Sequence, residues 1–196
     1  MNAGISRSHA LPARTRQRGS FVLPLPPAAA FDLFTAEGEQ RWVACWEPVI
    51  LSDCGATEPG AVFLTDHGGE QTIWTVLEAD RAAGRLAYSR VSPGRRAGTV
   101  RVSLAHCPDG TRVEVAYDLT SLGGDGDRAV RSMDAAGFGR MLGEWQRLIG
   151  EALERGPSEP AGRQRRSARA RHGHLPKCIS NGPKRKWAGI AASPRT

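Results

Sequence analysis

The sequence RAVRSMDAAGFGRMLGEWQRLIGEALER, residues 128–155, decides the fold. Its apolar side chains recur at steps of three and four residues, which places them on one stripe of a helix. They are Phe138, Met141, Leu142, Trp145, Leu148, Ile149, Ala152 and Leu153. A helix of this length measures about 40 Å at 1.5 Å per residue, so it can cross a whole small domain. We therefore expect one long helix on which the rest of the domain packs.

Four glycines fall within this predicted helix, at positions 137, 139, 143 and 150. Each costs about 1 kcal/mol relative to alanine inside a helix, so another requirement must favour the missing side chains. Gly139, Gly143 and Gly150 lie on nearly one line along the helix. We expect this bare strip either to let a sheet approach closely or to leave room for a ligand.

The middle of the chain shows the two-residue period of half-buried strands. The six predicted strands are 46–52, 61–66, 71–78, 85–91, 99–106 and 112–120. Short turns such as Gly68-Gly69 and Pro93-Gly94 separate them, so consecutive strands should pair antiparallel as a meander. The alternation predicts one buried face and one face in contact with water.

The residues before this meander predict one more strand and two short helices. Phe21 and Leu23 begin an alternating apolar run, and Pro26-Pro27 can open a helix because proline is tolerated in the first turn. We expect short helices over 28–34 and 36–43, and with the meander and the long helix they make an α+β domain. A single long helix cannot fill the whole inner face of a curved sheet, so a pocket between them is expected.

Charge divides the 196 residues into three segments, although the net charge is +7. Residues 20–155 hold 13 arginines and 19 acidic residues, residues 1–19 hold four arginines and no acid, and residues 156–196 hold ten basic residues and one glutamate. The two basic segments show no apolar period, so we expect disordered arms on either side of a domain at 20–155. The C-terminal arm could contact phosphates or anionic lipid weakly, but no recognised nucleic-acid-binding module accompanies it.

Several classes of protein and site are not expected. The four cysteines lack the spacing of a redox or zinc motif, and no apolar run reaches the ~18 residues of a membrane-spanning helix, so we expect reduced thiols and a cytoplasmic location. His172, His174 and Cys178 have a loosely zinc-like spacing without a fourth ligand, and we expect no metal site. No phosphate-binding loop or nucleophile motif occurs, so no cofactor is expected. The sequence does not specify an oligomeric state.

Four stretches before the long helix carry a resemblance to a known family. They are LPLPPAAAFDLFT (23–35), EGEQRWVACWEP (37–48), EPGAVFLT (58–65) and WTVLEADRAAGRLAY (74–88). With the terminal helix they resemble the START-like superfamily, also called SRPBCC or helix-grip proteins, which includes polyketide cyclases/dehydrases and the Hsp90-ATPase-activator-like group. The resemblance covers residues 20–155, and its motifs are packing motifs without a catalytic signature, so it concerns fold rather than activity.

The resemblance implies a cavity for a small hydrophobic or amphipathic molecule, walled by the strands, the second short helix and the long helix. The residues that we expect to line it are Trp42, Phe63, Trp74, Tyr88, Tyr117, Met141 and Trp145. The alternative is that these side chains simply fill the core. Arg90 follows Tyr88 at strand spacing and could bind an acidic group of the ligand, or it could point to solvent.

His67 and Glu144 are the two candidates for acid–base chemistry. His67 ends a predicted strand and could lie at the mouth of the cavity, although its place before Gly68-Gly69 is typical of an exposed hairpin residue. Glu144 neighbours Trp145 and could point inward, but surface ion pairs with Arg140 and Arg147 explain it equally well.

Three functions are consistent with these patterns. We expect a binder of a small hydrophobic or amphipathic ligand. The first alternative is an enzyme that cyclises or dehydrates a polyketide-like substrate, which requires a buried ionisable group with a shifted pKa in the pocket. The second is an interaction protein similar to the Hsp90-activator relatives, which predicts a filled core and an exposed apolar patch.

Overall fold

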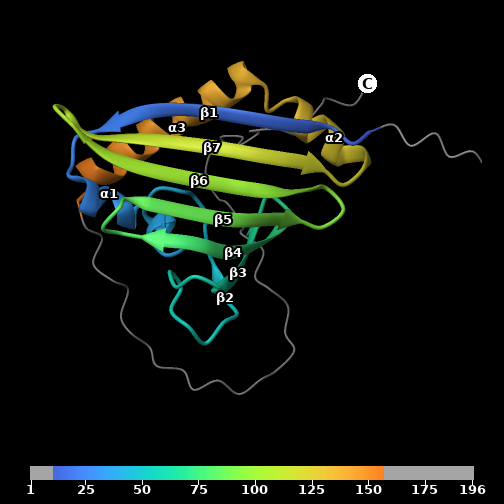
Figure 1. The fold of residues 1–196 in the computed structure, drawn as a ribbon, viewed down its shortest axis with the longest axis horizontal. Helices are drawn as coiled ribbons and strands as arrows, with labels where there is room; N and C mark the ends of the chain where they lie inside the picture. Colours follow the sequence, from blue (N-terminus) through green and yellow to red (C-terminus); the bar gives the residue numbers. More distant parts are fainter. Residues whose placement is uncertain (1–10, 157–196) are drawn as a thin grey trace, which may run out of the picture.

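The computed structural model describes residues 11–156, which form one antiparallel sheet of seven strands and three α-helices (Figure 1). The strands are β1 (Arg14–Leu23), β2 (Val49–Ile50), β3 (Val62–His67), β4 (Glu70–Asp80), β5 (Arg85–Ser92), β6 (Arg96–Cys107) and β7 (Gly110–Ser121). The helices are α1 (Pro27–Asp32), α2 (Gly124–Arg131) and α3 (Ala135–Glu154), with a short 3-10 helix η1 (Gly38–Arg41). The strand order β1-β7-β6-β5-β4-β3-β2 confirms the predicted α+β helix-grip arrangement.

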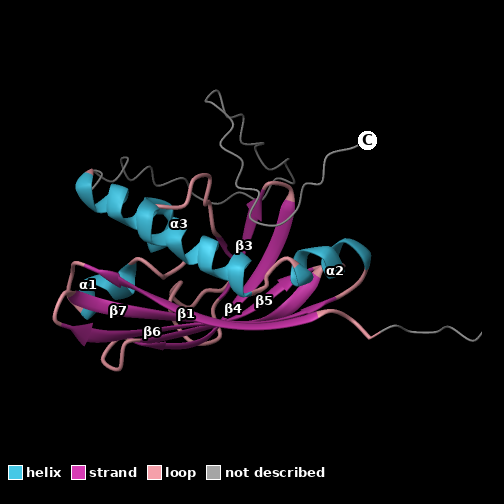
Figure 2. Cartoon of the chain, turned by 90° about the horizontal axis from the view of Figure 1, so that it is seen from above, coloured by secondary structure: helices cyan, strands magenta, loops and turns pink. Residues whose placement is uncertain are grey.

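Local turn chemistry produces the meander from β2 to β7. Gly68 and Gly69 adopt φ values of 62° and 80° between β3 and β4, a conformation that costs glycine little. A bulge between Val76 and Glu78 disturbs the register of β4 and bends the sheet locally. Figure 2 shows the curved sheet with α3 lying across one of its faces. The space between α3 and this face therefore contains both the core and the site described below.

The core lies where α3 packs on the sheet, chiefly against β1. Phe138, Leu142 and Ile149 of α3 are buried, as are Val115 and Leu119 on the inner face of β7. Within residues 11–156, no helix combines the length and the apolar character that a bilayer crossing would need.

The first strand begins earlier than the sequence predicted. The basic composition predicts a disordered arm through residue 19, but β1 pairs with β7 along its whole length, from Arg14 opposite Thr120 onwards. Arg14 and Arg16 both form ion pairs with Asp118, at 2.9 Å and 3.0 Å. The positive charge that marked an arm in the sequence therefore belongs to cross-strand pairs with β7. The predictions for residues 1–10 and 157–196, including the zinc-like residues of the tail, lie outside the described residues.

The second predicted helix, over 36–43, is reduced to the single turn of η1. The chain turns so sharply that a Cβ added to Gly38 would lie 1.5 Å from the carbonyl oxygen of Asp32. The backbone N–H of Gly38 donates to Thr35 Oγ1 at 3.0 Å, which stabilises the turn. Because Gly38 must approach α1 this closely, a regular α-helix cannot continue through it.

The first predicted strand of the meander, over 46–52, is also wrong for most of its length. Only Val49 and Ile50 of this stretch form a strand, β2, which pairs with β3. The Trp46 indole N–H donates to the carbonyl oxygen of Ala36 at 2.7 Å, so this residue is tied to the segment before η1 and does not pair in the sheet. Strands β3 to β7 agree with the predicted strands to within a few residues at each end.

The long C-terminal rod is divided into two helices. Asp134 is the N-cap of α3, and its Oδ1 accepts a hydrogen bond from the backbone N–H of Gly137 at 2.7 Å. The preceding residue, Met133, is buried, and its carbonyl oxygen accepts a hydrogen bond from Thr15 Oγ1 of β1 at 2.7 Å. This contact with a distant strand fixes the break between α2 and α3, and the apolar period alone gave no sign of it.

The glycine strip of α3 does not serve for close approach of the sheet. A Cβ added to Gly139, Gly143 or Gly150 would meet no other atom within 4 Å, so the sheet does not approach the helix there. None of the three lines the main cavity, but Gly139 and Gly143 line a smaller pocket of about 320 Å³ between α3 and β1. The close approach is made from the strand, because a Cβ on Gly19 would lie 2.6 Å from Leu142 Cδ1.

Candidate functional site

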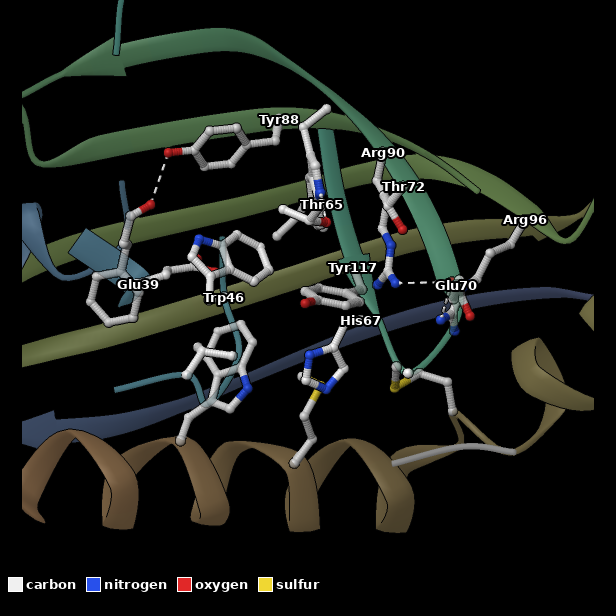
Figure 3. Close-up of a pocket in the computed structure, with 18 of the residues that line it drawn as sticks. Glu39, Trp46, Thr65, His67, Glu70, Thr72, Tyr88, Arg90, Arg96 and Tyr117 are labelled. Carbon is white, nitrogen blue, oxygen red and sulfur yellow. Dashed lines mark hydrogen bonds and ion pairs between the residues drawn. The ribbon is translucent and has the colours of Figure 1, made fainter. Parts of the chain in front are cut away.

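A cavity of about 830 Å³ lies between α3 and the sheet. Its walls come from β3 to β7, from the segment that carries η1, and from the ends of α2 and α3 that face the sheet (Figure 3). Ligand pockets of proteins typically enclose ~300–1,000 Å³, so the space is large enough for a molecule of drug-like size.

The structure brings together all ten residues singled out in the sequence. The cavity is lined by Trp42, Phe63, Trp74, Tyr88, Arg90, Tyr117, Met141 and Trp145, and also by His67 and Glu144. The strand residues lie together because period-two alternation places them on the inner face of the sheet. Met141 and Trp145 face them from α3.

One part of the wall is an aromatic cluster on β3, β4 and β5. The Phe63 and Trp74 rings stack with centroids 5.9 Å apart and planes 9° apart, and Tyr88 meets both edge-on, at 6.2 Å and 6.3 Å. The Trp74 indole N–H donates to Thr65 Oγ1 at 3.0 Å, and the Tyr88 hydroxyl donates to the carbonyl oxygen of Phe34 at 2.8 Å. These hydrogen bonds satisfy the polar atoms of the aromatic side chains and hold the rings in place.

A second aromatic group connects α3 to the opposite wall. Trp145 meets Trp42 edge-on with ring centroids 5.4 Å apart, and Tyr117 at 6.4 Å. The Trp42 indole N–H donates to the carbonyl oxygen of Leu33 at 2.7 Å. Burial raises the pKa of Tyr117 to about 12, so this hydroxyl stays neutral around pH 7.

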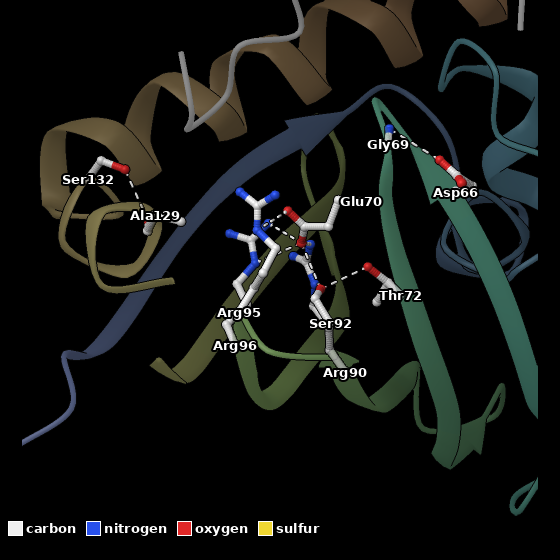
Figure 4. A network of polar contacts seen from close by, with 10 residues as sticks. All are labelled: Asp66, Gly69, Glu70, Thr72, Arg90, Ser92, Arg95, Arg96, Ala129 and Ser132. Carbon is white, nitrogen blue, oxygen red and sulfur yellow. Dashed lines mark hydrogen bonds and ion pairs between the residues drawn. The ribbon is translucent and has the colours of Figure 1, made fainter. Parts of the chain in front are cut away.

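The other end of the cavity is polar and positively charged (Figure 4). Arg90, Arg95 and Arg96 each form an ion pair with the single carboxylate of Glu70, at 3.3, 3.5 and 2.7 Å. Ser92 Oγ donates to the same carboxylate at 2.7 Å. Burial raises the pKa of Glu70, but the hydrogen bond from Ser92 and the Arg96 guanidinium outweigh burial, so the pKa lies below its ordinary value.

Glu39 is the acidic residue with the most altered environment. It lines the cavity from η1, and burial raises its pKa from 4.5 to about 8, although the positive charge of Arg90 opposes the shift. Burial and the Glu39 carboxylate also raise the pKa of Tyr88, which stays neutral. Glu39 therefore can gain or lose a proton near neutral pH while it faces the cavity.

His67 and Glu144 both lie at the cavity, but in different surroundings. His67 is half-buried at the end of β3, in contrast to the exposed hairpin position that its neighbouring glycines indicated. Glu144 is 39 % exposed and forms an ion pair with Arg147 at 2.6 Å, as the surface-pair interpretation expected. Arg90 points into the site, and its side chain is only 14 % exposed, so the solvated alternative is wrong.

Sequence reasoning missed Glu39, Trp46, Glu70, Arg95 and Arg96, all of which line the cavity. A signal existed for Glu70, because alternation along β4 places it on the same face as Trp74. No such signal marked Glu39, because an acidic residue in the first turn of a predicted helix usually faces water. Within residues 11–156, no group of three or more His, Cys, Asp or Glu side chains could hold a metal ion.

Comparison with solved structures identifies the architecture. The crystal structure of Ara h 8.0201 matches with a TM-score of 0.53 at 14% identity, over 72% of this chain and 99% of that one. Protein MLL2253 from Mesorhizobium loti matches with a TM-score of 0.54 at 14% identity, over 74% of this chain and 100% of that one. The chain has the START-like helix-grip fold.

A third structure with this helix-grip fold is norcoclaurine synthase from Thalictrum flavum, with a TM-score of 0.51 at 8% identity, over 71% of this chain and 88% of that one. No family model matches the sequence, and neither does any curated protein. Identities this low show a shared fold alone, so the function must be argued from the site itself.

Proposed function

We propose that the protein binds a small hydrophobic or amphipathic molecule in the cavity between α3 and the sheet. The observation that carries the proposal is a space of about 830 Å³ between α3 and the sheet whose lining includes eight aromatic side chains. Apolar surface in contact with water is unfavourable at about 25 cal/mol per Å², so a guest with a matching apolar body would be stabilised there.

The cavity walls are fixed by hydrogen bonds that resist collapse. The indole N–H groups of Trp42, Trp46 and Trp74 donate at 2.7, 2.7 and 3.0 Å to oxygens of neighbouring segments. Moving these rings inward to fill the space would break bonds that cost roughly 1–3 kcal/mol each to leave unmade. A preformed cavity of this kind favours binding, because little ordering remains to be done when the ligand enters.

A neutral apolar dye tests the proposal directly. N-phenyl-1-naphthylamine becomes fluorescent in an apolar environment, and we expect it to bind the whole protein at about one molecule per chain. Trp145→Ala removes the ring that meets Trp42 and Tyr117, and it should weaken binding about tenfold or more. Leu77→Ala, at a side chain that is 47 % exposed, is the matched control and should leave the affinity unchanged.

Ligand retained from the cell gives an independent test. Native mass spectrometry of the protein purified from its own cells should show a bound small molecule, and Trp145→Ala should release it. If no dye binds, or if Trp145→Ala and Leu77→Ala behave alike, the proposed function or the placement of its pocket is wrong.

Glu39 favours a second candidate function, acid–base catalysis on the bound molecule. A carboxyl group with a pKa near 8 that faces an apolar cavity can take or give a proton at neutral pH. The reaction class expected for it is cyclisation or dehydration of a poly-β-ketone. Turnover of a linear poly-β-ketone thioester should then follow a titration near pH 8, and Glu39→Gln should abolish turnover while dye binding persists. Turnover that Glu39→Gln leaves intact would exclude this role.

The interaction-protein alternative receives no support from the site. It required a filled core in place of a cavity, and the cavity contradicts that requirement. The large apolar side chains exposed within residues 11–156 are mostly scattered, which is ordinary for a monomer surface. We therefore retain the binder and the enzyme as the two candidates.

A further inference from the structure

Three guanidinium groups share one carboxylate at the polar end of the cavity. The side chains of Arg90, Arg95 and Arg96 are 14 %, 32 % and 7 % exposed, and the Glu70 side chain is 14 % exposed. In the whole lining of the cavity, five arginines face three glutamates. Glu39, one of those three, has a pKa of about 8 and is mostly protonated at pH 7. The cavity therefore holds an excess of partly buried positive charge.

The donors around Glu70 crowd onto one of its carboxylate oxygens. Its Oε1 receives Ser92 Oγ at 2.7 Å, two nitrogens of Arg96 at 2.7 and 3.1 Å, and Arg90 Nη2 at 3.3 Å. One carboxylate oxygen has about two acceptor positions, so this oxygen cannot satisfy all of these donors well. Arg90 Nε is buried and has no hydrogen-bond partner among residues 11–156. A buried donor without an acceptor is unfavourable by roughly 1–3 kcal/mol, or more when it is charged.

An anionic group of a ligand at this end would supply further acceptors, both for the donors that crowd the Glu70 oxygen and for Arg90 Nε. Guanidinium groups bind carboxylate and phosphate through paired N–H donors, and such charge-assisted bonds are about twice as strong as neutral ones. The partial burial of Arg90 and Arg96 strengthens the attraction, because fewer water molecules screen it. Figure 4 shows the guanidinium groups of Arg90, Arg95 and Arg96 gathered around Glu70.

The charged end adjoins the aromatic wall directly. The Arg90 guanidinium carbon lies 5.2 Å from the centre of the Trp74 ring. A molecule with its apolar body against Trp74 and Tyr88 would thus bring one end to the three arginines. On the basis of the proposed function, we infer that the ligand is an amphipathic anion whose carboxylate or phosphate is held by Arg90, Arg95 and Arg96.

Two dyes with the same aromatic scaffold test this inference. 1-Anilinonaphthalene-8-sulfonate carries an anionic group, whereas N-phenyl-1-naphthylamine lacks it. The quantity to measure is the ratio of the two dissociation constants in each variant, because the ratio cancels changes in the shared aromatic site. Arg90→Met keeps much of the side-chain volume and removes the charge. We expect it to raise the ratio of the sulfonate's dissociation constant to that of the neutral dye about tenfold or more.

A second variant and a control guard against misfolding. Arg95→Gln changes a more exposed side chain and should shift the ratio in the same direction by a smaller factor. Arg101→Met removes an equal charge on β6, where Arg101 is exposed and its neighbours Val100 and Val102 line the cavity, so it should shift nothing. Raising the salt concentration should weaken binding of the sulfonate and should not weaken binding of the neutral dye. Circular dichroism melts establish that each variant is folded.

The outcomes separate this inference from the proposed function. If neither dye binds the folded protein, the proposed function fails. If the neutral dye binds but Arg90→Met and Arg95→Gln leave the ratio unchanged, only the anion site fails.

Competition against the neutral dye then distinguishes the head groups. Dodecanoate and dodecyl phosphate should each displace it about tenfold better than 1-dodecanol, and their ranking assigns a carboxylate or a phosphate. Equal displacement by all three would overturn the inference.

Discussion

Arg90 and Trp74 face each other across β5 and β4, with the guanidinium carbon 5.2 Å from the centre of the indole ring. This pair marks the boundary between the aromatic and the charged parts of the cavity. A cation over an indole face is stabilised by about 1–2 kcal/mol when it is partly desolvated. The pair therefore joins the two parts energetically as well as in space.

A double-mutant cycle measures this coupling. Arg90→Met, Trp74→Leu and the double variant should give free energies of unfolding that differ from additivity by about 1 kcal/mol. Urea denaturation followed by circular dichroism supplies the values. Additive single changes would mean that the two side chains are neighbours without an energetic connection.

Glu39 should make stability depend on pH. Its folded-state pKa is about 8 against an ordinary value of 4.5, so between these values the folded protein holds a proton that the unfolded chain has released. The free energy of unfolding should therefore fall as pH rises from about 4.5 to about 8. Glu39→Gln stays neutral, so its advantage over the natural protein should grow across this window to about 1 kcal/mol or more. A difference that does not change with pH would show that Glu39 is solvated.

Substitution by alanine should stabilise the protein at Gly143 and destabilise it at Gly19. Gly143 lies inside α3 with no atom within 4 Å of an added Cβ, so Gly143→Ala should stabilise the protein by about 1 kcal/mol. At Gly19 the same Cβ would lie 2.6 Å from Leu142 Cδ1, and overpacking of this kind costs ~1–3 kcal/mol. Thermal unfolding of both variants is the measurement. Equal shifts would contradict the helix position on β1.

Truncation locates the start of the domain. A chain that begins at residue 11 keeps all of β1, and we expect its melting temperature to match that of the full chain. A chain that begins at residue 20 loses the pairs from Arg14 to Gly19 and the Thr15 hydrogen bond to Met133. It also exposes one edge of β7, which invites aggregation. If the shorter chain were stable and monomeric, the boundary would lie where the sequence alone put it.

Local patterns predicted the parts of the fold that local forces determine. Alternation and glycine turns gave β3 to β7, and the same alternation brought Phe63, Trp74 and Tyr88 to one face. The failures occur where distant segments decide. The first half of β1 depends on acidic residues about 100 positions away, since Arg14 pairs with Asp118. The break before α3 depends on Thr15, whose hydrogen bond no helical period can reveal.

The candidate site divides in the same way. Its aromatic residues could be predicted, because large apolar side chains on an inner strand face have few other places to go. Its charged end could not, because arginine and glutamate on strands ordinarily face water, and only the folded sheet brings Glu70 to Arg96. Glu39 was missed because the sequence predicted a longer helix where the chain forms the turn at Gly38 and the short helix η1.

The three arginines at the charged end fall within seven consecutive positions, on the end of β5, the following turn and the start of β6. The aromatic walls, by contrast, come from segments spread over most of the domain. Residues 90–96 can therefore be changed while the aromatic walls stay in place, so the preferred head group can be altered separately from the apolar part of the cavity. Replacing these arginines with glutamates, and Glu70 with arginine, should convert the protein into a receptor for amphipathic cations.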